Sequence, residues 1–155
     1  MIRHYYADTS VLAKRHLNEI GSTWFRGICL TRENNIIVTA RISIVEMYSA
    51  FNRRKREKQL AEQAYADITA DIAVICTNEY QFVELTDIVI ERARVLLESY
   101  ALRAYDAVQL ASALFANGAL QASGLPALTF LAADERLLEA AKAEGLLVDN
   151  PNWHA

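Results

Sequence analysis

The sequence predicts an α/β protein of three layers, in which helices cover both faces of a mostly parallel central sheet. Short apolar segments alternate with helices or helix pairs along the chain, and this alternation is typical of parallel sheets. The 155 residues are 53% hydrophobic and include only 5 Gly and 2 Pro, which excludes a disordered or linker-like chain. Because this length suits one hydrophobic core, we expect residues 1–155 to form a single domain.

Five segments have the composition of buried strands. Each is short, rich in β-branched, aromatic or aliphatic residues, and free of Gly and Pro, as expected for strands covered on both faces. The predicted strands are residues 3–7, 36–40, 80–85, 128–133 and 146–148.

Seven segments have the apolar spacing of helices. The first is expected to begin near Ser10 and to reach Leu17, because Asp8, Thr9 and Ser10 are residue types that favour helix N-caps. Gly145 is a good residue to close the last helix. The other predicted helices are residues 23–32, 43–58, 60–75, 87–100, 105–120 and 134–143.

Composition also limits the functional classes. Cys29 and Cys76 match no metal or disulfide pattern, and we expect both to be buried free thiols in a reducing cytosol. Asp8 precedes any secretory apolar region, and no apolar run approaches the roughly 20 residues of a membrane span. A cytoplasmic protein is therefore expected. The net charge of −3 argues against nucleic-acid binding through bulk charge.

Four acidic residues are candidates for a functional site. Ligands of parallel sheets bind outside the carboxyl ends of the strands, and Asp8 and Asp134 each follow a predicted strand. Asp106 lies in the first turn of a helix, and Glu46 lies inside another. Asp8 and Asp134 also have an ordinary explanation as helix N-caps, and Asp106 as a first-turn acid that favours the helix dipole.

Glu46 is the least ordinary of the four. It stands between Val45 and Met47 in a mostly apolar stretch, where an ionised carboxylate has to face solvent or a partner. At helical spacing it shares a stripe with Ser43 and Arg53. This stripe indicates either the wall of a cleft or a solvated helix face.

Four blocks of sequence, one around each acid, resemble a known family in content and order. They are Tyr-Ala-Asp-Thr-Ser at 6–10, Ser-Ile-Val-Glu at 43–46, Leu-Arg-Ala-Tyr-Asp-Ala-Val-Gln-Leu-Ala at 102–111 and Phe-Leu-Ala-Ala-Asp-Glu-Arg-Leu at 130–137. Together they are similar to the PIN domain, and above all to the VapC toxins of type II toxin–antitoxin systems. The similarity spans nearly the whole chain, although residues 59–98 contribute little to it.

The resemblance implies a PIN-like three-layer domain with Mg²⁺- or Mn²⁺-dependent endoribonuclease activity. The implied catalytic residues are Asp8, Glu46, Asp106 and Asp134, with Asp8 and Asp106 as direct metal ligands and the other two acting through water. The chemistry agrees, because converging carboxylates repel each other unless a cation neutralises them. Oxygen ligands without His or Cys also select Mg²⁺ or Mn²⁺ over Zn²⁺.

Neighbouring residues have two possible roles each. Thr9 or Ser10 can hydrogen-bond a ligand carboxylate, although an ordinary N-cap explains either hydroxyl. Arg103 precedes Asp106 by less than a turn and can pair with one of the acids.

Binding of RNA requires positive charge near the acids, and a basic run ends the helix that contains Glu46. Arg53, Arg54 and Arg56 are the predicted RNA-binding residues, although a solvated helix end explains such a run equally well. Further positive charge near the acids comes from Lys58, Arg41, Lys14 and Arg15.

The resemblance also implies partners: an RNA substrate, a VapB-type antitoxin whose tail covers the cleft, and a second copy in a homodimer, with no membrane. The segment around Trp24 and Phe25 is a candidate docking surface, but core packing explains these aromatic residues equally well.

Other functional classes fit less well or stay open. A phosphotransferase of the haloacid-dehalogenase type needs a second Asp where Ser10 stands, and a receiver domain needs a Lys after the last strand, where Asp149 and Asn150 stand. A non-catalytic PIN-like module that binds protein, and a PIN nuclease outside toxin–antitoxin systems, remain alternatives.

Overall fold

The computed structural model describes residues 1–155 and has the predicted parallel sheet. Its five strands lie in the order β3-β2-β1-β4-β5, and all neighbours are parallel. In the centre of the sheet Tyr6 pairs with Val38 on one side and Phe130 on the other. The strands are β1 (Arg3–Ala7), β2 (Asn35–Ala40), β3 (Gln81–Val83), β4 (Thr129–Leu131) and β5 (Leu147–Asp149).

Two strands are shorter than the sequence predicts. β3 ends at Val83, since Val83 pairs with Ala40, the last residue of β2, and the segment up to Leu85 has no strand beside it. β4 ends at Leu131, opposite the last residue of β1. Pairing stops where the neighbouring strand stops, which composition alone does not encode.

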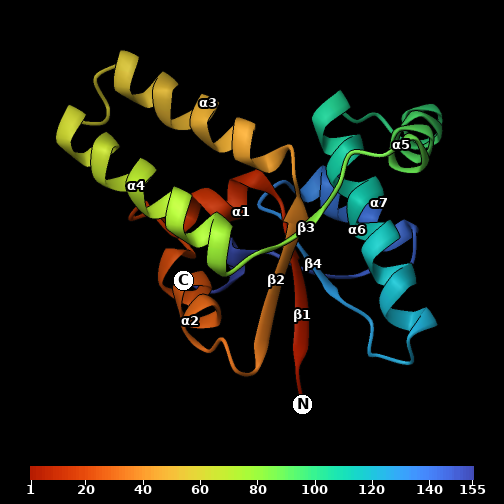
Figure 1. The fold of residues 1–155 in the computed structure, drawn as a ribbon. Coiled ribbons are helices and arrows are strands. Elements are labelled where there is room, and N and C mark those ends of the chain that lie inside the picture. Colours follow the sequence, from red (N-terminus) through yellow and green to blue (C-terminus); the bar gives the residue numbers. More distant parts are fainter.

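Helices cover both faces of the sheet (Figure 1). The first four lie on one side, seen at the left of the figure, and the last three lie on the other. The helices are α1 (Thr9–Lys14), α2 (Ser22–Leu30), α3 (Ser43–Arg56), α4 (Glu62–Asn78), α5 (Asp87–Ser99), α6 (Ala104–Ala122) and α7 (Glu135–Ala143), followed by the 3-10 turn η1 (Pro151–Trp153).

The sheet separates two apolar cores. On the side of α5, α6 and α7, the rings of Tyr6 and Phe130 stack with centroids 5.5 Å apart. On the other side, Phe25, Met47 and Phe51 are fully buried or nearly so. Phe25 is thus a core residue, and the docking interpretation is wrong for it.

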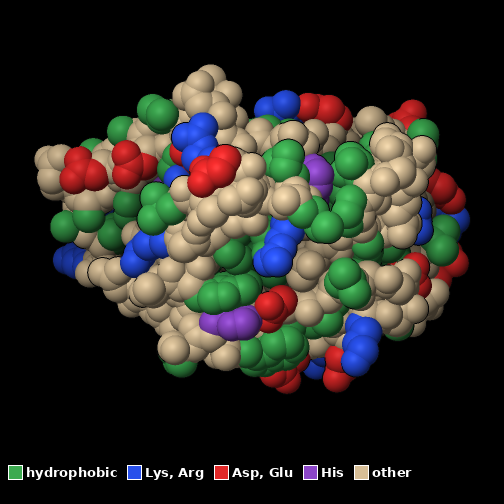
Figure 2. Space-filling model, turned by 90° about the horizontal axis from the view of Figure 1, so that it is seen from below, with side chains coloured by type: hydrophobic (Ala, Val, Ile, Leu, Met, Phe, Trp, Pro, Cys, Tyr) green, Lys and Arg blue, Asp and Glu red, His purple; other side chains and the backbone are tan.

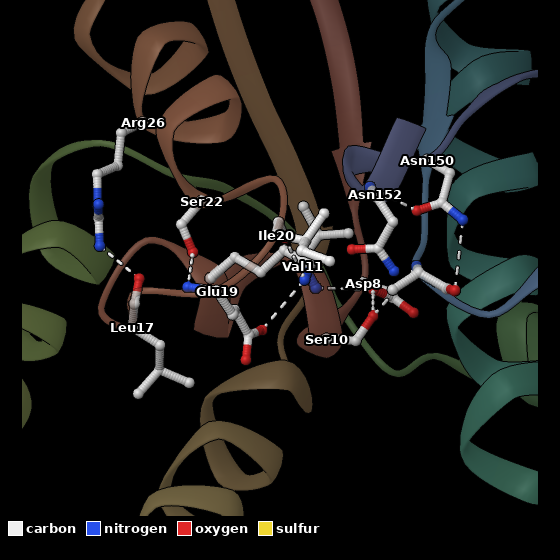
Figure 3. Close-up of polar contacts among 12 residues, drawn as sticks. Asp8, Ser10, Val11, Leu17, Glu19, Ile20, Ser22, Arg26, Asn150 and Asn152 are labelled. Carbon is white, nitrogen blue, oxygen red and sulfur yellow. Dashed lines mark hydrogen bonds and ion pairs between the residues drawn. The ribbon is translucent and has the colours of Figure 1, made fainter. Parts of the chain in front are cut away.

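The first helix ends earlier than predicted, at Lys14 rather than Leu17. The Lys14 ammonium donates to the carbonyl of Ile20 at 2.8 Å, and the Arg26 guanidinium donates to the carbonyl of Arg15 at 2.9 Å. Arg26 also donates to the carbonyl of Leu17 (Figure 3). These side chains hydrogen-bond carbonyls of the segment that follows Lys14, and they hold this segment as a loop between α1 and α2.

Both cysteines are free, as expected, but only Cys29 is buried, and Cys76 is partly exposed. None of the helices combines the length and the hydropathy that a membrane crossing requires. At the end of the molecule where the strands begin, acidic and basic side chains are interspersed (Figure 2).

Gly21 provides a test of how the chain end packs. It has φ +84°, and a Cβ there would lie 2.4 Å from the carbonyl oxygen of Pro151. Gly124 is a matched control, because it has φ +72° but no atom near its Cβ position. A left-handed alanine costs about 1 kcal/mol, and the clash adds at least about 1 kcal/mol.

We therefore expect Gly21→Ala to lower the free energy of unfolding more than Gly124→Ala does, as measured by urea denaturation. Equal losses would show that the contact between Gly21 and Pro151 is absent in solution.

Candidate active site

The candidate site lies where the strand order reverses. From β1 the chain continues toward β2 on one side, and from β4 it continues toward β5 on the other. Loops that leave two adjacent parallel strands in opposite directions open a crevice at the carboxyl edge of the sheet. Asp8 directly follows β1, and Asp134 follows β4 by three residues. The topology therefore places both residues at this crevice.

Asp8 is a buried carboxylate with one engaged oxygen. Its side chain is 6% exposed, and Oδ1 accepts hydrogen bonds from Ser10 Oγ at 2.6 Å and from the Val11 amide at 3.1 Å (Figure 3). Asp8 thereby caps α1, while no protein group donates to Oδ2. Burial raises the pKa of Asp8, the nearby charges of Asp106 and Glu46 add to the rise, and the two hydrogen bonds oppose it, so that the pKa is about 7.

Glu46 lies in the first turn of α3 and is partly buried. Its Oε1 accepts a hydrogen bond from Gln109 Nε2 at 3.0 Å. Burial raises the pKa of Glu46, and the charge of Asp106 adds to this rise, while hydrogen bonds from Gln109 and Thr9 oppose it. The cleft-wall interpretation of this helix stripe agrees with these contacts.

Asp106 lies in the first turn of α6 and Asp134 at the start of α7, and their negative charges repel each other. Burial and the charge of Asp134 raise the pKa of Asp106, and the charge of Arg103 opposes the rise. Asp134 is exposed and caps α7, since its Oδ1 accepts from the amides of Arg136 at 2.9 Å and Leu137 at 3.3 Å. The capping role is thus present and coexists with a position beside the other acids.

Two adjoining hollows form the cleft, and they share Arg103 and Asp106. One of about 460 Å³ is also lined by Glu46 and Arg53, and one of about 400 Å³ is also lined by Asp134. The structure thus brings the four predicted acids to one region and couples their charges in the pairs described above.

The donor set suits a hard cation, although the acids are not packed around one point. No three His, Cys, Asp or Glu side chains lie close enough together to hold a metal ion jointly. Mg²⁺ keeps several waters and is usually held by only one or two carboxylates. A buried carboxylate such as Asp8, with a raised pKa and a free Oδ2, is the kind of oxygen ligand that such an ion stabilises.

The residues predicted to support the acids differ in whether they contact them. Ser10 donates to Asp8, while Thr9 accepts from Gln109 Nε2 at 3.3 Å and hydrogen-bonds Glu46. The N-cap of α1 is Asp8 rather than either hydroxyl. Arg103 is exposed and forms no ion pair. It influences Asp106 only through its charge and backbone.

The predicted RNA-binding residues differ in position. Arg53 lines the cleft with Glu46, Arg54 lies 4.0 Å from a carboxylate oxygen of Glu19, and Arg56 lines a hollow between α3 and α4.

Three of the further cations do not supply free positive charge to the cleft. Lys14 is buried against Glu19 at 3.1 Å, Arg15 pairs with Glu79 at 2.7 Å, and Arg41 pairs with Glu84 at 2.6 Å. Each of these three cations is paired with an acid that lies across a loop or far away in the sequence, and this pairing reduces the positive charge that they offer to RNA.

Gln109 is a site residue that sequence analysis did not identify. It is 2% exposed and contacts Tyr6, Ser43, Thr9 and Glu46. A polar residue one turn after Asp106, in an otherwise apolar helix, was the available signal, since buried amides need hydrogen-bond partners.

Comparison with known proteins finds solved structures of similar fold. The chain is similar in fold to a chain of VapBC2 from Rickettsia felis bound to a promoter DNA fragment, with 14% identity, a TM-score of 0.62, and coverage of 95% of this chain and 98% of that one. It is also similar to FitAcB from Neisseria gonorrhoeae, with 16% identity, a TM-score of 0.65, and coverage of 97% of this chain and 99% of that one. A third similar structure is a toxin–antitoxin complex from Klebsiella pneumoniae, with 15% identity, a TM-score of 0.55, and coverage of 95% of this chain and 97% of that one.

Among curated proteins, the comparison finds no significant match. The family model described as PIN domain matches residues 5–143, which contain β2, β3, β4, the end of β1 and all four acids. With this match over most of its length, the chain belongs to the PIN domain family.

Proposed function

We propose that this chain is a Mg²⁺- or Mn²⁺-dependent endoribonuclease that acts in the cytoplasm as the toxin of a type II toxin–antitoxin pair. The observation that carries the proposal is the Asp8 carboxylate, buried at the switch point with Oδ2 free and with Glu46 and Asp106 in electrostatic contact. PIN domains are generally nucleases, and the solved structures of similar fold include toxin–antitoxin complexes.

In this proposal Asp8 and Asp106 hold the cation. When bound, the cation supplies charge neutralisation at the phosphodiester and activates water. Glu46 has Oε1 fixed by Gln109 and a pKa raised by burial, so its other oxygen is suited to take the proton of the attacking water. Asp134, exposed at the opposite wall, orients water or completes a second cation site.

The toxin role requires a partner that closes the cleft. An antitoxin tail with an arginine fits, because a guanidinium placed among these acids would neutralise them and compete with the cation. A homodimer is proposed on family resemblance.

Cleavage of total cellular RNA tests the activity. Asp8→Asn and Asp106→Asn should each reduce Mn²⁺-dependent cleavage by at least about a hundredfold, since loss of cation binding removes several kcal/mol of transition-state stabilisation. Asp67→Asn is the control, because Asp67 is exposed on α4 and contacts only Gln63. Protein that cuts no RNA with either cation would instead support the non-catalytic module.

The raised pKa of Asp8 predicts a pH-dependent stability. Between the unfolded value of 3.8 and about 7 the folded state keeps a proton that the unfolded state has released, so stability falls as pH rises through this window. Asp8→Asn has no such proton and keeps an oxygen that accepts from Ser10 and Val11. We expect the variant to gain stability over the wild type from pH 4 to pH 7, as measured by thermal melts without metal.

Saturating Mn²⁺ should reduce this gain at pH 7, because the cation stabilises the ionised carboxylate of the wild type and not the amide. A stability difference between Asp8→Asn and the wild type that depends on neither pH nor Mn²⁺ would contradict a buried, cation-binding Asp8.

Arg53 is the predicted RNA contact that lines the cleft. Arg53→Gln should raise the KM for RNA and reduce the slope of log affinity against log salt by about 1, as expected for one lost phosphate contact. Arg94→Gln on α5 is the matched control, since Arg94 is paired with Glu91 and Glu98. An unchanged salt slope in Arg53→Gln would remove Arg53 from the RNA interface.

A further inference from the structure

The side chain of Gln109 connects three parts of the chain that contain the acids. It lies in α6 one turn after Asp106, and it is 2% exposed. Its Nε2 lies 3.0 Å from Glu46 Oε1 and 2.9 Å from Ser43 Oγ, both on α3, and its Oε1 lies 2.5 Å from the Tyr6 hydroxyl on β1. Two buried hydroxyl groups, Thr39 and Ser43, continue the network on the side of α3 and β2.

The donor and acceptor of each hydrogen bond around Gln109 can be assigned by starting from the carbonyl of Ala7, where this chain of hydrogen bonds ends. Thr39 Oγ1 donates to the carbonyl of Ala7 at 2.7 Å, and a carbonyl only accepts. The Thr39 proton is thereby used, so Ser43 must donate to Thr39 across their 2.8 Å contact. Ser43 Oγ is then the acceptor for Gln109 Nε2.

The hydrogen bond between Tyr6 and Gln109, at the other end of this network, requires the same orientation of the Gln109 amide. Burial raises the pKa of Tyr6 far above its usual value, so its hydroxyl keeps its proton and donates to Gln109 Oε1. The carboxamide of Gln109 therefore has only one orientation that satisfies its partners, with the oxygen toward β1 and the nitrogen toward α3. In that orientation the second Nε2 proton points to Glu46.

We propose that Gln109 is the positioning residue for Glu46, holding one carboxylate oxygen so that the other faces the cleft, and that the same network fixes the backbone at Ala7, directly before Asp8. This inference rests on the proposed nuclease function for its catalytic meaning. The hydrogen bonds that carry it are independent of that function.

A packing role alone does not account for these contacts. An apolar residue would fill the same space in α6, which is otherwise rich in Ala and Leu. The carboxamide instead donates to a half-buried carboxylate, and this bond opposes the rise in the pKa of Glu46 that burial causes. Such hydrogen bonds orient the side chains of active sites and commonly affect activity about tenfold to a hundredfold.

The first part of the test uses Gln109→Met, which keeps the length of the side chain and removes its donors and acceptor. We expect kcat for RNA cleavage to fall about tenfold to a hundredfold, with KM for RNA within about twofold of the wild type. Gln121→Met makes the same change at the exposed end of α6 and should leave both constants unchanged. Tyr6→Phe keeps the ring that stacks on Phe130 and removes only the donor to Gln109, so it should lower kcat in the same direction and serves if Gln109→Met does not fold.

The second part needs no activity. The carboxyl carbon of Glu46 is titrated by NMR in metal-free protein, and Gln109→Met should raise the pKa of Glu46 above that of the wild type and of Gln121→Met. If the wild type cuts no RNA, the proposed function fails while this titration still decides the role of Gln109. An unchanged Glu46 titration in Gln109→Met overturns the positioning role, whatever happens to cleavage.

Discussion

The site depends on a carboxylate that is placed where water cannot fully solvate it. Asp8 directly follows β1, the central strand of the sheet, which has a strand on each side, and Asp8 is buried there. An ionised group in such a place is unfavourable without compensation. Two donors, Ser10 and the Val11 amide, compensate one oxygen only. The other oxygen is left for a ligand, and the neighbouring acids increase the demand for positive charge.

The fold supplies this arrangement with short connections. The acids come from the ends of β1 and β4 and from the first turns of α3 and α6. These are the parts of an α/β domain that meet at one edge of the sheet. The same positions suit acids for local reasons, because first turns and N-caps favour negative charge. Helix capping and the grouping of acids are therefore compatible, and Asp134 caps α7 while its charge acts on Asp106.

Features that depend on residues close together in the sequence, such as helices and strands, could be predicted. All five strands and seven helices were located, since apolar runs and capping residues are local signals. The sequence did not predict what depends on distant partners. The sequence places Lys14 and Arg15 close after Asp8, but it does not reveal that Glu19 and Glu79 pair with them. The helix α1 ends three residues before the predicted Leu17, and Arg26, eleven residues after Arg15, binds the carbonyl of Arg15 in the loop that follows it.

Gln109 illustrates the same limit at the site itself. Its partners Tyr6, Ser43 and Glu46 are 103, 66 and 63 residues away, so no spacing rule applies to them. The packing of Gly21 against Pro151 also joins distant parts of the chain. It implies that the two positions cannot diverge independently. A relative with a side chain at position 21 would need a differently routed C-terminal segment, and aligned sequences should show the two changes occurring together.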